Sequence, residues 1–433
     1  MNGEELFHRL QAGDTSVIPG ATAAKATGWM YHLDDVRFTT LIKNLDQRLP
    51  RHKDRTVLLG MGGSSSGGGL YADVKLSSRL TILDTSHPDD ITQTDFSSAT
   101  VIAASKSGGT VETICSLAWA LDHGLDVADL VVISDPGTAL HELGQSLGAV
   151  VIDGDPLTGG RFSAFSAFGV VPALLSGWTA TELLDLRRPG ATEAITALED
   201  GLRCGAAVDA GAPQPYVLPG DPLLSYTSLW EEQLVAESTG KRGVGIVPLA
   251  GPTAPLPHEV LVHCWQRHWW TVGASVGMGV DPFDQPDVEA AKRNVFTLLQ
   301  PGAEPTAIPA YTSERNANYV TLQVFAPLAS APMVAALRDR LATPNRLVTA
   351  GIGPRFLHST GQLHKGGPGS IQAVQVVVEP ATEPRRIPGR RYSFHDLIRA
   401  QADADALALH AAGRSVERVS LSSLDELASL HLD

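Results

Sequence analysis

The stretch RTVLLGMGGSSSGGG, residues 55–69, decides the fold of this chain. Its first part is apolar and ends in glycine, which is typical of a buried strand. A turn rich in glycine and serine follows, and such a turn lets the backbone approach a bound anion closely. The sequence therefore predicts a strand over residues 55–60 and a ligand-binding turn over residues 61–69.

Short apolar runs recur after this strand and alternate with stretches of helical spacing. The predicted strands are residues 80–83, 100–104, 130–133 and 149–152, and the predicted helices between them are residues 113–121 and 139–147. This alternation is typical of a parallel, doubly wound α/β sheet. A further amphipathic helix is predicted over residues 35–49.

The second half contains the same kinds of element in a less regular order. Candidate strands are residues 215–218, 245–248, 319–324 and 375–378, and helical stretches are residues 163–186, 191–211, 258–277 and 287–299. The end of the chain has a predicted helix over residues 396–412 and a strand over residues 416–421. We therefore expect an N-terminal helical segment, two α/β domains and a short α+β tail, at residues 1–50, 51–190, 191–380 and 381–433.

Composition excludes several classes of protein. The 433 residues include 33 Lys and Arg against 47 Asp and Glu, for a net charge of −14. A chain this acidic lacks the spread of positive charge that nucleic acids and anionic membranes attract. Three separated cysteines argue against a disulfide framework or a zinc site, and no apolar run is long enough to span a membrane. We expect a soluble, cytoplasmic protein without a metal.

A second loop, SKSGGTVET at residues 105–113, follows the predicted strand at residues 100–104. Both loops thus fall at the carboxyl ends of parallel strands, where open α/β sheets bind ligands. Neither has the spacing of a dinucleotide fingerprint or a P-loop. An ordinary turn is the alternative for either loop alone, but two loops at matching strand ends favour binding of a phosphate monoester. The predicted donors are Gly62, Gly63, Ser64, Ser105, Lys106, Ser107 and Thr110.

Several segments together resemble the phosphoglucose isomerase family, which has the sugar isomerase fold. They are GMGGS at residues 60–64, SKSGGTVET at 105–113, GGRFS at 159–163, QLVAESTGK at 233–241, DPFDQPDVEAAK at 281–292 and LHSTGQ at 357–362. The resemblance implies two sugar isomerase domains and reversible isomerisation of glucose 6-phosphate and fructose 6-phosphate. It also implies a homodimer. Because proton transfer needs no redox cofactor and the sequence has no metal-binding cluster, we expect no cofactor.

The order of the segments departs from that of the ordinary family. There the histidine segment precedes the F-D-Q-P segment, whereas here it follows. This order and the string GPRFLHSTGQLHKGGP, residues 353–368, resemble the isomerase half of transaldolase–isomerase fusion proteins. We therefore favour His358 as the acid/base that opens the sugar ring, since imidazole titrates near neutral pH. His258 is the alternative, because it lies where the ordinary order would place the histidine.

Aldose–ketose isomerisation needs a base, donors for an enediolate and a group that opens the ring. The resemblance assigns the base to Glu237, enediolate stabilisation to Arg161, assistance in ring opening to Lys292 and phosphate binding to Gln233. Spacing alone does not separate Glu237 from Glu231 and Glu232, although Gln233 and Glu237 would share one face of a helix.

Two other functions compete with this one. The first is an isomerase for a related phosphosugar such as mannose 6-phosphate. The second is a catalytically silent phosphosugar-binding or regulatory protein, which the joint presence of Glu237, Arg161, Lys292 and a histidine disfavours. A metal site at His263 and His268 is also disfavoured, because residues five apart face different sides of a helix; packing with the neighbouring tryptophans is preferred.

Overall fold

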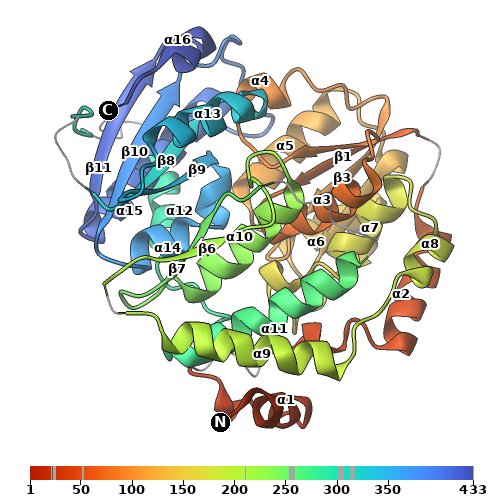
Figure 1. Ribbon diagram of the computed structural model, residues 1–433. Coiled ribbons are helices and arrows are strands. Elements are labelled where there is room, and N and C mark those ends of the chain that lie inside the picture. Colours follow the sequence, from red (N-terminus) through yellow and green to blue (C-terminus); the bar gives the residue numbers. More distant parts are fainter. Residues whose placement is uncertain are drawn as a thin grey trace. The chain divides into compact units, whose positions relative to one another are not determined.

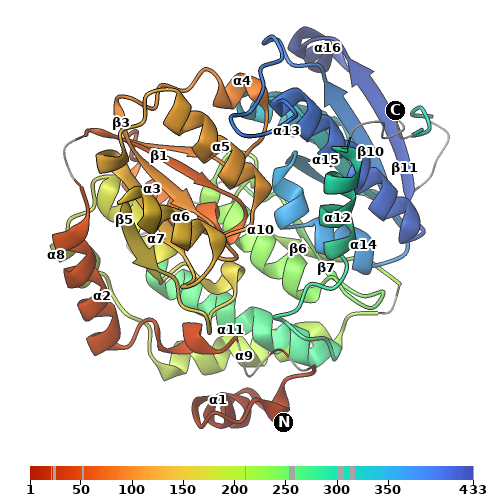
Figure 2. The same ribbon diagram turned by 180° about the vertical axis from the view of Figure 1, so that it is seen from behind.

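The computed structural model describes residues 1–20, 22, 26–50, 53–209, 211–252, 259–300, 307–312 and 317–432 (Figures 1 and 2). Internal contacts divide the chain into two compact units. Unit 1 comprises Met1–Asp84, Asp95–Ala207 and Ala254–Asp284. Unit 2 comprises Thr85–Thr94, Val208–Thr253 and Gln285–Asp433.

Unit 1 contains a five-stranded parallel sheet in the order β2-β1-β3-β4-β5. The strands are β1 (Arg55–Gly60), β2 (Leu80–Leu83), β3 (Ala99–Ala104), β4 (Leu130–Ser134) and β5 (Val150–Asp153). The strand order reverses between β1 and β3, and such a switch point is where a doubly wound sheet binds its ligand. Strands β3 and β4 are buried along their whole length, which explains their continuous apolar sequence.

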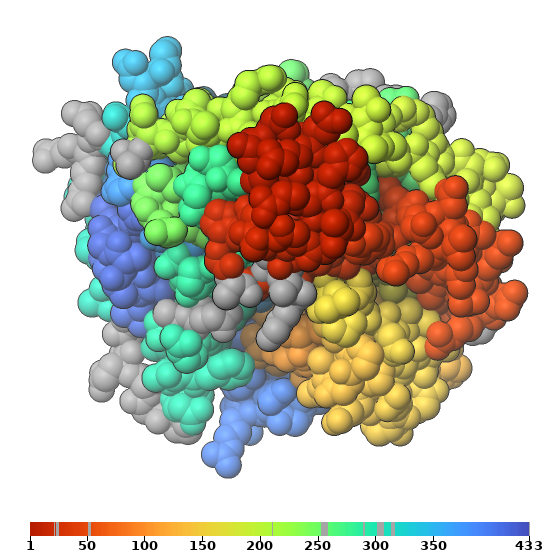
Figure 3. All heavy atoms as spheres, turned by 90° about the horizontal axis from the view of Figure 1, so that it is seen from below, coloured from red at the N-terminus to blue at the C-terminus, as the bar shows by residue number. Residues whose placement is uncertain are grey.

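Helices connect these strands and extend the unit. They are α1 (Gly3–Gln11), α2 (Asp35–Arg48), α3 (Gly63–Lys75), α5 (Val111–Asp122), α6 (Ala139–Leu147), α7 (Ala167–Leu175), α8 (Ala180–Asp185), α9 (Ala191–Ala206) and α11 (Val260–Met278). Figure 3 shows α1, in red, lying against the yellow-green α9. The predicted α/β class is confirmed, and β1 and α6 have the predicted bounds.

An aromatic cluster holds α11 within unit 1. The Trp29 ring lies 5.2 Å from that of Phe162 and 4.8 Å from that of Trp269, measured between centroids. His268 is fully buried among these rings, 5.0 Å from Phe162. Burial lowers the pKa of His268 to about 3, so the imidazole is neutral at physiological pH. His268 is thus a packing residue, and its ring contacts those of Trp29, Phe162 and Phe165, which are not the neighbouring tryptophans that the sequence suggests.

The predicted glycine–serine turn is wrong over most of its length, because helix α3 begins at Gly63. Only Gly62, with a φ of 55°, keeps a turn conformation that favours glycine. The small residues serve close packing instead. A Cβ on Gly63 would lie 2.1 Å from the Gly160 carbonyl oxygen, and one on Gly68 would lie 2.6 Å from the Pro172 side chain. The high glycine and serine content of residues 61–69 therefore serves close packing and does not indicate a flexible linker.

Gly63→Ala is therefore expected to destabilise unit 1 by roughly 1–3 kcal/mol, the usual cost of overpacking. Gly109→Ala is the matched control, because a Cβ there would meet nothing within 4 Å. Thermal denaturation followed by circular dichroism measures both variants. Equal midpoints for the two would contradict this account of the close approach.

Unit 2 contains a four-stranded parallel sheet and a two-stranded parallel sheet. The larger has the order β11-β10-β8-β9 and consists of β8 (Tyr319–Phe325), β9 (Leu347–Ile352), β10 (Ile371–Val378) and β11 (Ser415–Leu421). The smaller pairs β6 (Gln214–Val217) with β7 (Ile246–Leu249). The helices are α4 (Pro88–Ile91), α10 (Tyr226–Thr239), α12 (Glu289–Leu298), α13 (Ala331–Leu341), α14 (Gly361–Gly366), α15 (Phe394–Ala411) and α16 (Leu424–Ser429).

The units differ from the predicted domain boundaries. The predicted tail, residues 381–433, belongs to unit 2, where β11 pairs with β10 from Gln372↔Ser415 to Val378↔Leu421 and completes the sheet. The predicted N-terminal segment, residues 1–50, belongs to unit 1. Within the described ranges, no helix combines the length and apolarity that crossing a bilayer requires.

Candidate active site

Two loops of unit 1 flank the switch point between β1 and β3. In the first, Gly62 and Gly63 begin helix α3, and Ser64 lies buried in its first turn. The close approach of Gly63 to Gly160 brings this helix start against the turn that carries Arg161. The N–H groups of Ser64 and Ser65 donate to the carbonyl oxygens of Met61 and Gly62 at 3.2 and 3.0 Å, so the predicted binding of an anion by this loop stays a prediction.

The second loop leads from β3 into α5. Ser105 is buried, and its hydroxyl lies 2.8 Å from that of Thr110, the residue that precedes the helix. Ser107 is exposed, and Gly108 has a φ of 65°. The loop thus presents the hydroxyls of Ser107 and Thr110 beside a helix start. This arrangement can receive a phosphate group.

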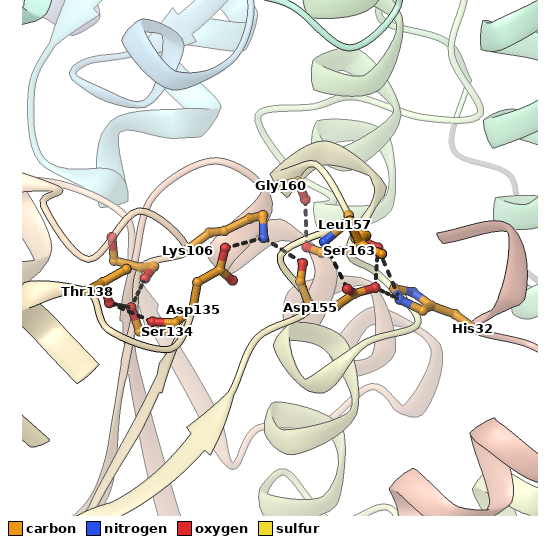
Figure 4. Close-up of polar contacts among 11 residues, drawn as sticks. His32, Lys106, Ser134, Asp135, Thr138, Asp155, Leu157, Gly160 and Ser163 are labelled. Atoms are coloured by element: carbon orange, nitrogen blue, oxygen red, sulfur yellow. Dashed lines mark hydrogen bonds and ion pairs between the residues drawn. The ribbon is translucent and has the colours of Figure 1, made fainter. Parts of the chain in front are cut away.

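Lys106 has a further set of contacts, shown in Figure 4. Its Nζ donates to Asp135 Oδ2 at 2.6 Å and to the Asp155 carbonyl oxygen at 2.7 Å. Burial raises the pKa of the Asp135 carboxyl, although Lys106 acts in the opposite direction. Lys106 therefore joins the second loop to the ends of β4 and β5. Its contact with phosphate stays a prediction.

Asp155 links this lysine to the turn that precedes Arg161 (Figure 4). Its Oδ2 accepts from the Thr158 hydroxyl at 2.7 Å and lies 2.9 Å from His32 Nε2. The hydrogen bond with His32, followed by that from Thr158, holds the pKa of the Asp155 carboxyl well below its usual range. The ionised carboxylate thus fixes the turn in place.

Arg161 lies in the short helix Gly160–Phe162 and is 5% exposed. Its Nη2 donates to the carbonyl oxygens of Pro282 and Asp284 at 3.0 and 2.8 Å. Residues 159–163 therefore meet the first residues of the segment 281–292 within unit 1. The contacts fix the guanidinium, which stays charged at any physiological pH and suits a developing oxyanion.

Helix α10 of unit 2 presents Gln233 and Glu237 on one face, as their spacing predicts. Gln233 Nε2 donates to Glu237 Oε2 at 2.9 Å and to the His358 carbonyl oxygen at 2.9 Å. Both α10 side chains are buried, and His358 is half-buried. The predicted base and the predicted histidine segment are thus brought together by one amide. The two N–H groups of that amide each have an acceptor.

The other two glutamates of α10 have different surroundings. Glu231 accepts a hydrogen bond from the Tyr216 hydroxyl and is fully buried. Glu232 lines a small cavity together with Arg355, and burial raises the pKa of Glu232 to about 8. Glu237 shares the Gln233 amide with the His358 backbone, which favours it as the base.

Gln362 joins three further segments within unit 2. Its Oε1 accepts from the Asp287 N–H at 3.0 Å, and its Nε2 donates to Asp287 Oδ2 at 2.5 Å and to the Gly240 carbonyl oxygen at 3.0 Å. Asp287 precedes α12, which carries the half-buried Lys292. Gln362 therefore connects three segments: the end of α10, which bears Glu237, the turn before α12, which bears Lys292, and the residues that follow His358. The alternative histidine, His258, lies outside the described residues.

The sequence does not predict the residues that hold the candidate site side chains in position. Gln362 falls inside a recognised motif but received no role, and Asp287 stands at a variable position of another. Asp135, Asp155 and His32 belong to no motif. The signal that could have found Asp135 and Asp155 is their position, because each follows the end of a predicted strand.

Comparison with curated proteins finds glucose-6-phosphate isomerases. The chain is 28% identical to that of Campylobacter jejuni over 249 residues, which are 51% of this chain and 60% of the relative. It is 31% identical to one from Thermus thermophilus over 249 residues, 52% of this chain and 60% of the relative. The matches thus span less than two thirds of these relatives. No family model matches the chain.

Solved structures give matches at low identity. A glucose-6-phosphate isomerase from Chlamydia trachomatis is 14% identical with a TM-score of 0.45, and the match covers 61% of this chain and 72% of that one. A hypothetical protein from Thermus thermophilus is 20% identical with a TM-score of 0.35, and the match covers 99% of this chain and 85% of that one.

Proposed function

We propose that this chain is a member of the phosphoglucose isomerase family and catalyses the reversible isomerisation of glucose 6-phosphate and fructose 6-phosphate. One observation carries the proposal. The buried amide of Gln233 contacts both the Glu237 carboxylate and the backbone of His358, at 2.9 Å each. These contacts support the proposal because they join Glu237, the proposed base, to the segment that carries His358, the proposed ring-opening residue.

The groups proposed to bind charge are residues of the two loops, Gln233 and Arg161. Hydroxyls of Ser105, Ser107 and Thr110, with backbone N–H groups of the two loops, bind the phosphate. Gly62, Gly63, Ser64, Lys106 and Gln233 complete the proposed set of substrate-binding residues. Arg161, held by the carbonyls of Pro282 and Asp284, stabilises the enediolate.

The groups proposed to move protons are His358, Lys292 and Glu237. His358 and Lys292 open the sugar ring by proton transfer at the ring oxygen and the C1 hydroxyl. Glu237 then removes the proton from C2 of the open-chain aldose. The C2–H electron pair forms the C1–C2 double bond of the enediolate, and negative charge develops on the C1 oxygen. Return of the proton to C1, with transfer of the O2 proton to O1, gives the ketose.

A coupled assay tests the proposed reaction. Purified protein converts fructose 6-phosphate to glucose 6-phosphate, which a dehydrogenase reports as NADPH. We expect turnover in the presence of EDTA, with mannose 6-phosphate assayed in parallel as the related substrate. Absence of turnover, with glucose 6-phosphate still raising the denaturation midpoint, would instead support a silent phosphosugar-binding protein.

Substitution of the phosphate loop is expected to weaken binding more than turnover. Ser107→Ala with Thr110→Val removes two hydroxyl donors, while Thr110 provides no side-chain cap to α5. Since a hydrogen bond to a charged group contributes about 1.5–3 kcal/mol, KM should rise by roughly tenfold or more. Ser146→Ala, an exposed serine on α6, is the control. An unchanged KM would place the phosphate elsewhere.

The family resemblance also supports a homodimer that works in the cytoplasm without a cofactor. Light scattering of the purified protein tests the assembly. A mass of twice the 45.7 kDa chain supports the dimer, and a mass equal to one chain would overturn it.

A further inference from the structure

Helix α14, Gly361–Gly366, begins shortly after His358 and is too short to be stable by itself. Gln362 holds its first turn through Asp287 and Gly240. His364 is buried, with Nε2 lying 3.0 Å from the Thr321 hydroxyl and Nδ1 lying 3.3 Å from Gln323 Nε2. Burial keeps the pKa of His364 well below its usual range, so this ring is neutral. The helix is thus fixed by side-chain contacts rather than by its own length.

The C-terminal segment of the chain holds the other end of this helix. Lys365 Nζ donates to Asp405 Oδ1 at 2.5 Å, and the two side chains are 2% and 0% exposed. The Arg414 guanidinium donates to the carbonyl oxygens of Lys365, Gly367 and Pro368 at 2.8, 2.6 and 2.9 Å. Carbonyls at a helix end lack partners within the helix, and a guanidinium satisfies them.

A buried ion pair of this kind is weak evidence for stability. Its desolvation cost offsets most of the attraction, and apolar residues of similar volume often stabilise a protein as well or better. A charge pair does, however, require one geometry, since a displaced Lys365 would leave Asp405 buried without its partner. The pair therefore defines the position of α14 more sharply than apolar packing would.

We infer that Asp405 and Arg414 are positioning residues for His358, the proposed ring-opening group. Gln233 fixes the carbonyl of His358 from one side, and α14 fixes the chain that follows it. The C-terminal segment thereby determines the position of the His358 imidazole, although neither Asp405 nor Arg414 contacts that ring. The inference rests on the proposed function and gives a role to residues 381–433, for which the sequence indicates none.

Ring opening can be measured separately from isomerisation. Opening and reclosing interconverts the α and β anomers of glucose 6-phosphate without proton transfer at C2. Magnetisation-exchange NMR gives the rate of anomer interconversion and the rate of isomerisation in one sample. A residue that positions His358 affects the first rate more than the second, whereas loss of folded protein lowers both by the same factor.

Arg414→Met is the test variant, and Arg399→Met is its control. Arg399 lies on α15 with a side chain that is 67% exposed, where it pairs with Glu379. We expect Arg414→Met to slow anomer interconversion by roughly ten- to hundredfold, the effect of about 1 Å of misplacement, and to lower its ratio to isomerisation. His358→Ala should show the same change in ratio, and Arg399→Met should match the unaltered protein.

A second variant tests the inference in case Arg414→Met does not fold. Lys365→Met with Asp405→Leu removes both buried charges together, so that neither is left unpaired. It should fold and still lower the ratio of the two rates. If a variant folds and its ratio of anomer interconversion to isomerisation is unchanged, the inference is overturned. An unaltered protein that isomerises without speeding anomer interconversion would also overturn it, whereas one with neither activity would defeat the proposed function itself.

Discussion

Glu237→Gln is expected to lower kcat by roughly 10²–10⁴-fold, the range that a positioned acid/base contributes. The amide keeps the size of the carboxylate and can still contact Gln233, but it cannot accept the C2 proton. The coupled assay measures the loss. Binding of glucose 6-phosphate should survive, and a retained rise in denaturation midpoint with the ligand checks this.

The neighbouring glutamates serve as controls for this variant. Glu231 accepts a hydrogen bond from the Tyr216 hydroxyl, and Glu232 lines a small cavity together with Arg355 and Ser359. If Glu237→Gln keeps near-normal turnover while Glu232→Gln loses it, the base has been assigned to the wrong glutamate. Because Glu232 is buried, its variant must first be shown to fold.

Arg161→Met is expected to lower kcat by roughly 10²–10³-fold, since removing one oxyanion donor commonly has that effect. The two carbonyls that accept from the Arg161 guanidinium hold the charge in one place before substrate arrives. Such prior fixing is what makes an electrostatic contribution large. The coupled assay, with kcat and KM determined separately, measures the variant.

Two comparisons make the arginine prediction specific. Arg161→Lys keeps a charge but not the planar group that contacts two carbonyls, so it should recover only part of the rate. Arg187→Met, an arginine of unit 1 with a half-exposed side chain, should leave kcat unchanged. A rise in KM without loss of kcat in Arg161→Met would show that Arg161 binds the ground state and not the enediolate.

Much of the fold follows from the sequence because its strands are apolar runs between clear turns. Strand β9 was missed, since Thr349 and Gly351 interrupt its apolar run. Helix α13 was missed as well, and its buried Arg338 belongs to an ion pair with Asp221 that no local pattern indicates. The start of α3 was misread because glycines that permit close packing have the composition of a turn.

The residues of the candidate site also fall into those that local sequence predicts and those that it does not. Motifs nominate Arg161, Gln233, Glu237, Lys292 and His358, since each carries recognisable chemistry in a local context. Their partners come from distant parts of the chain. The contact from Gln233 to His358 spans 125 residues, and that from Lys365 to Asp405 spans 40. Such pairs depend on how strands and helices pack, which spacing along one sequence does not reveal.

The most direct test of the proposed chemistry is isomerisation in D₂O. Fructose 6-phosphate is converted by the unaltered protein, and NMR follows deuterium at C2 of the glucose 6-phosphate formed. Proton transfer through Glu237 and an enediolate should place solvent deuterium at C2, because the carboxyl proton exchanges with solvent, and Glu237→Gln should form almost no product. Product that forms at the normal rate in Glu237→Gln, or that carries no deuterium at C2, would contradict the account.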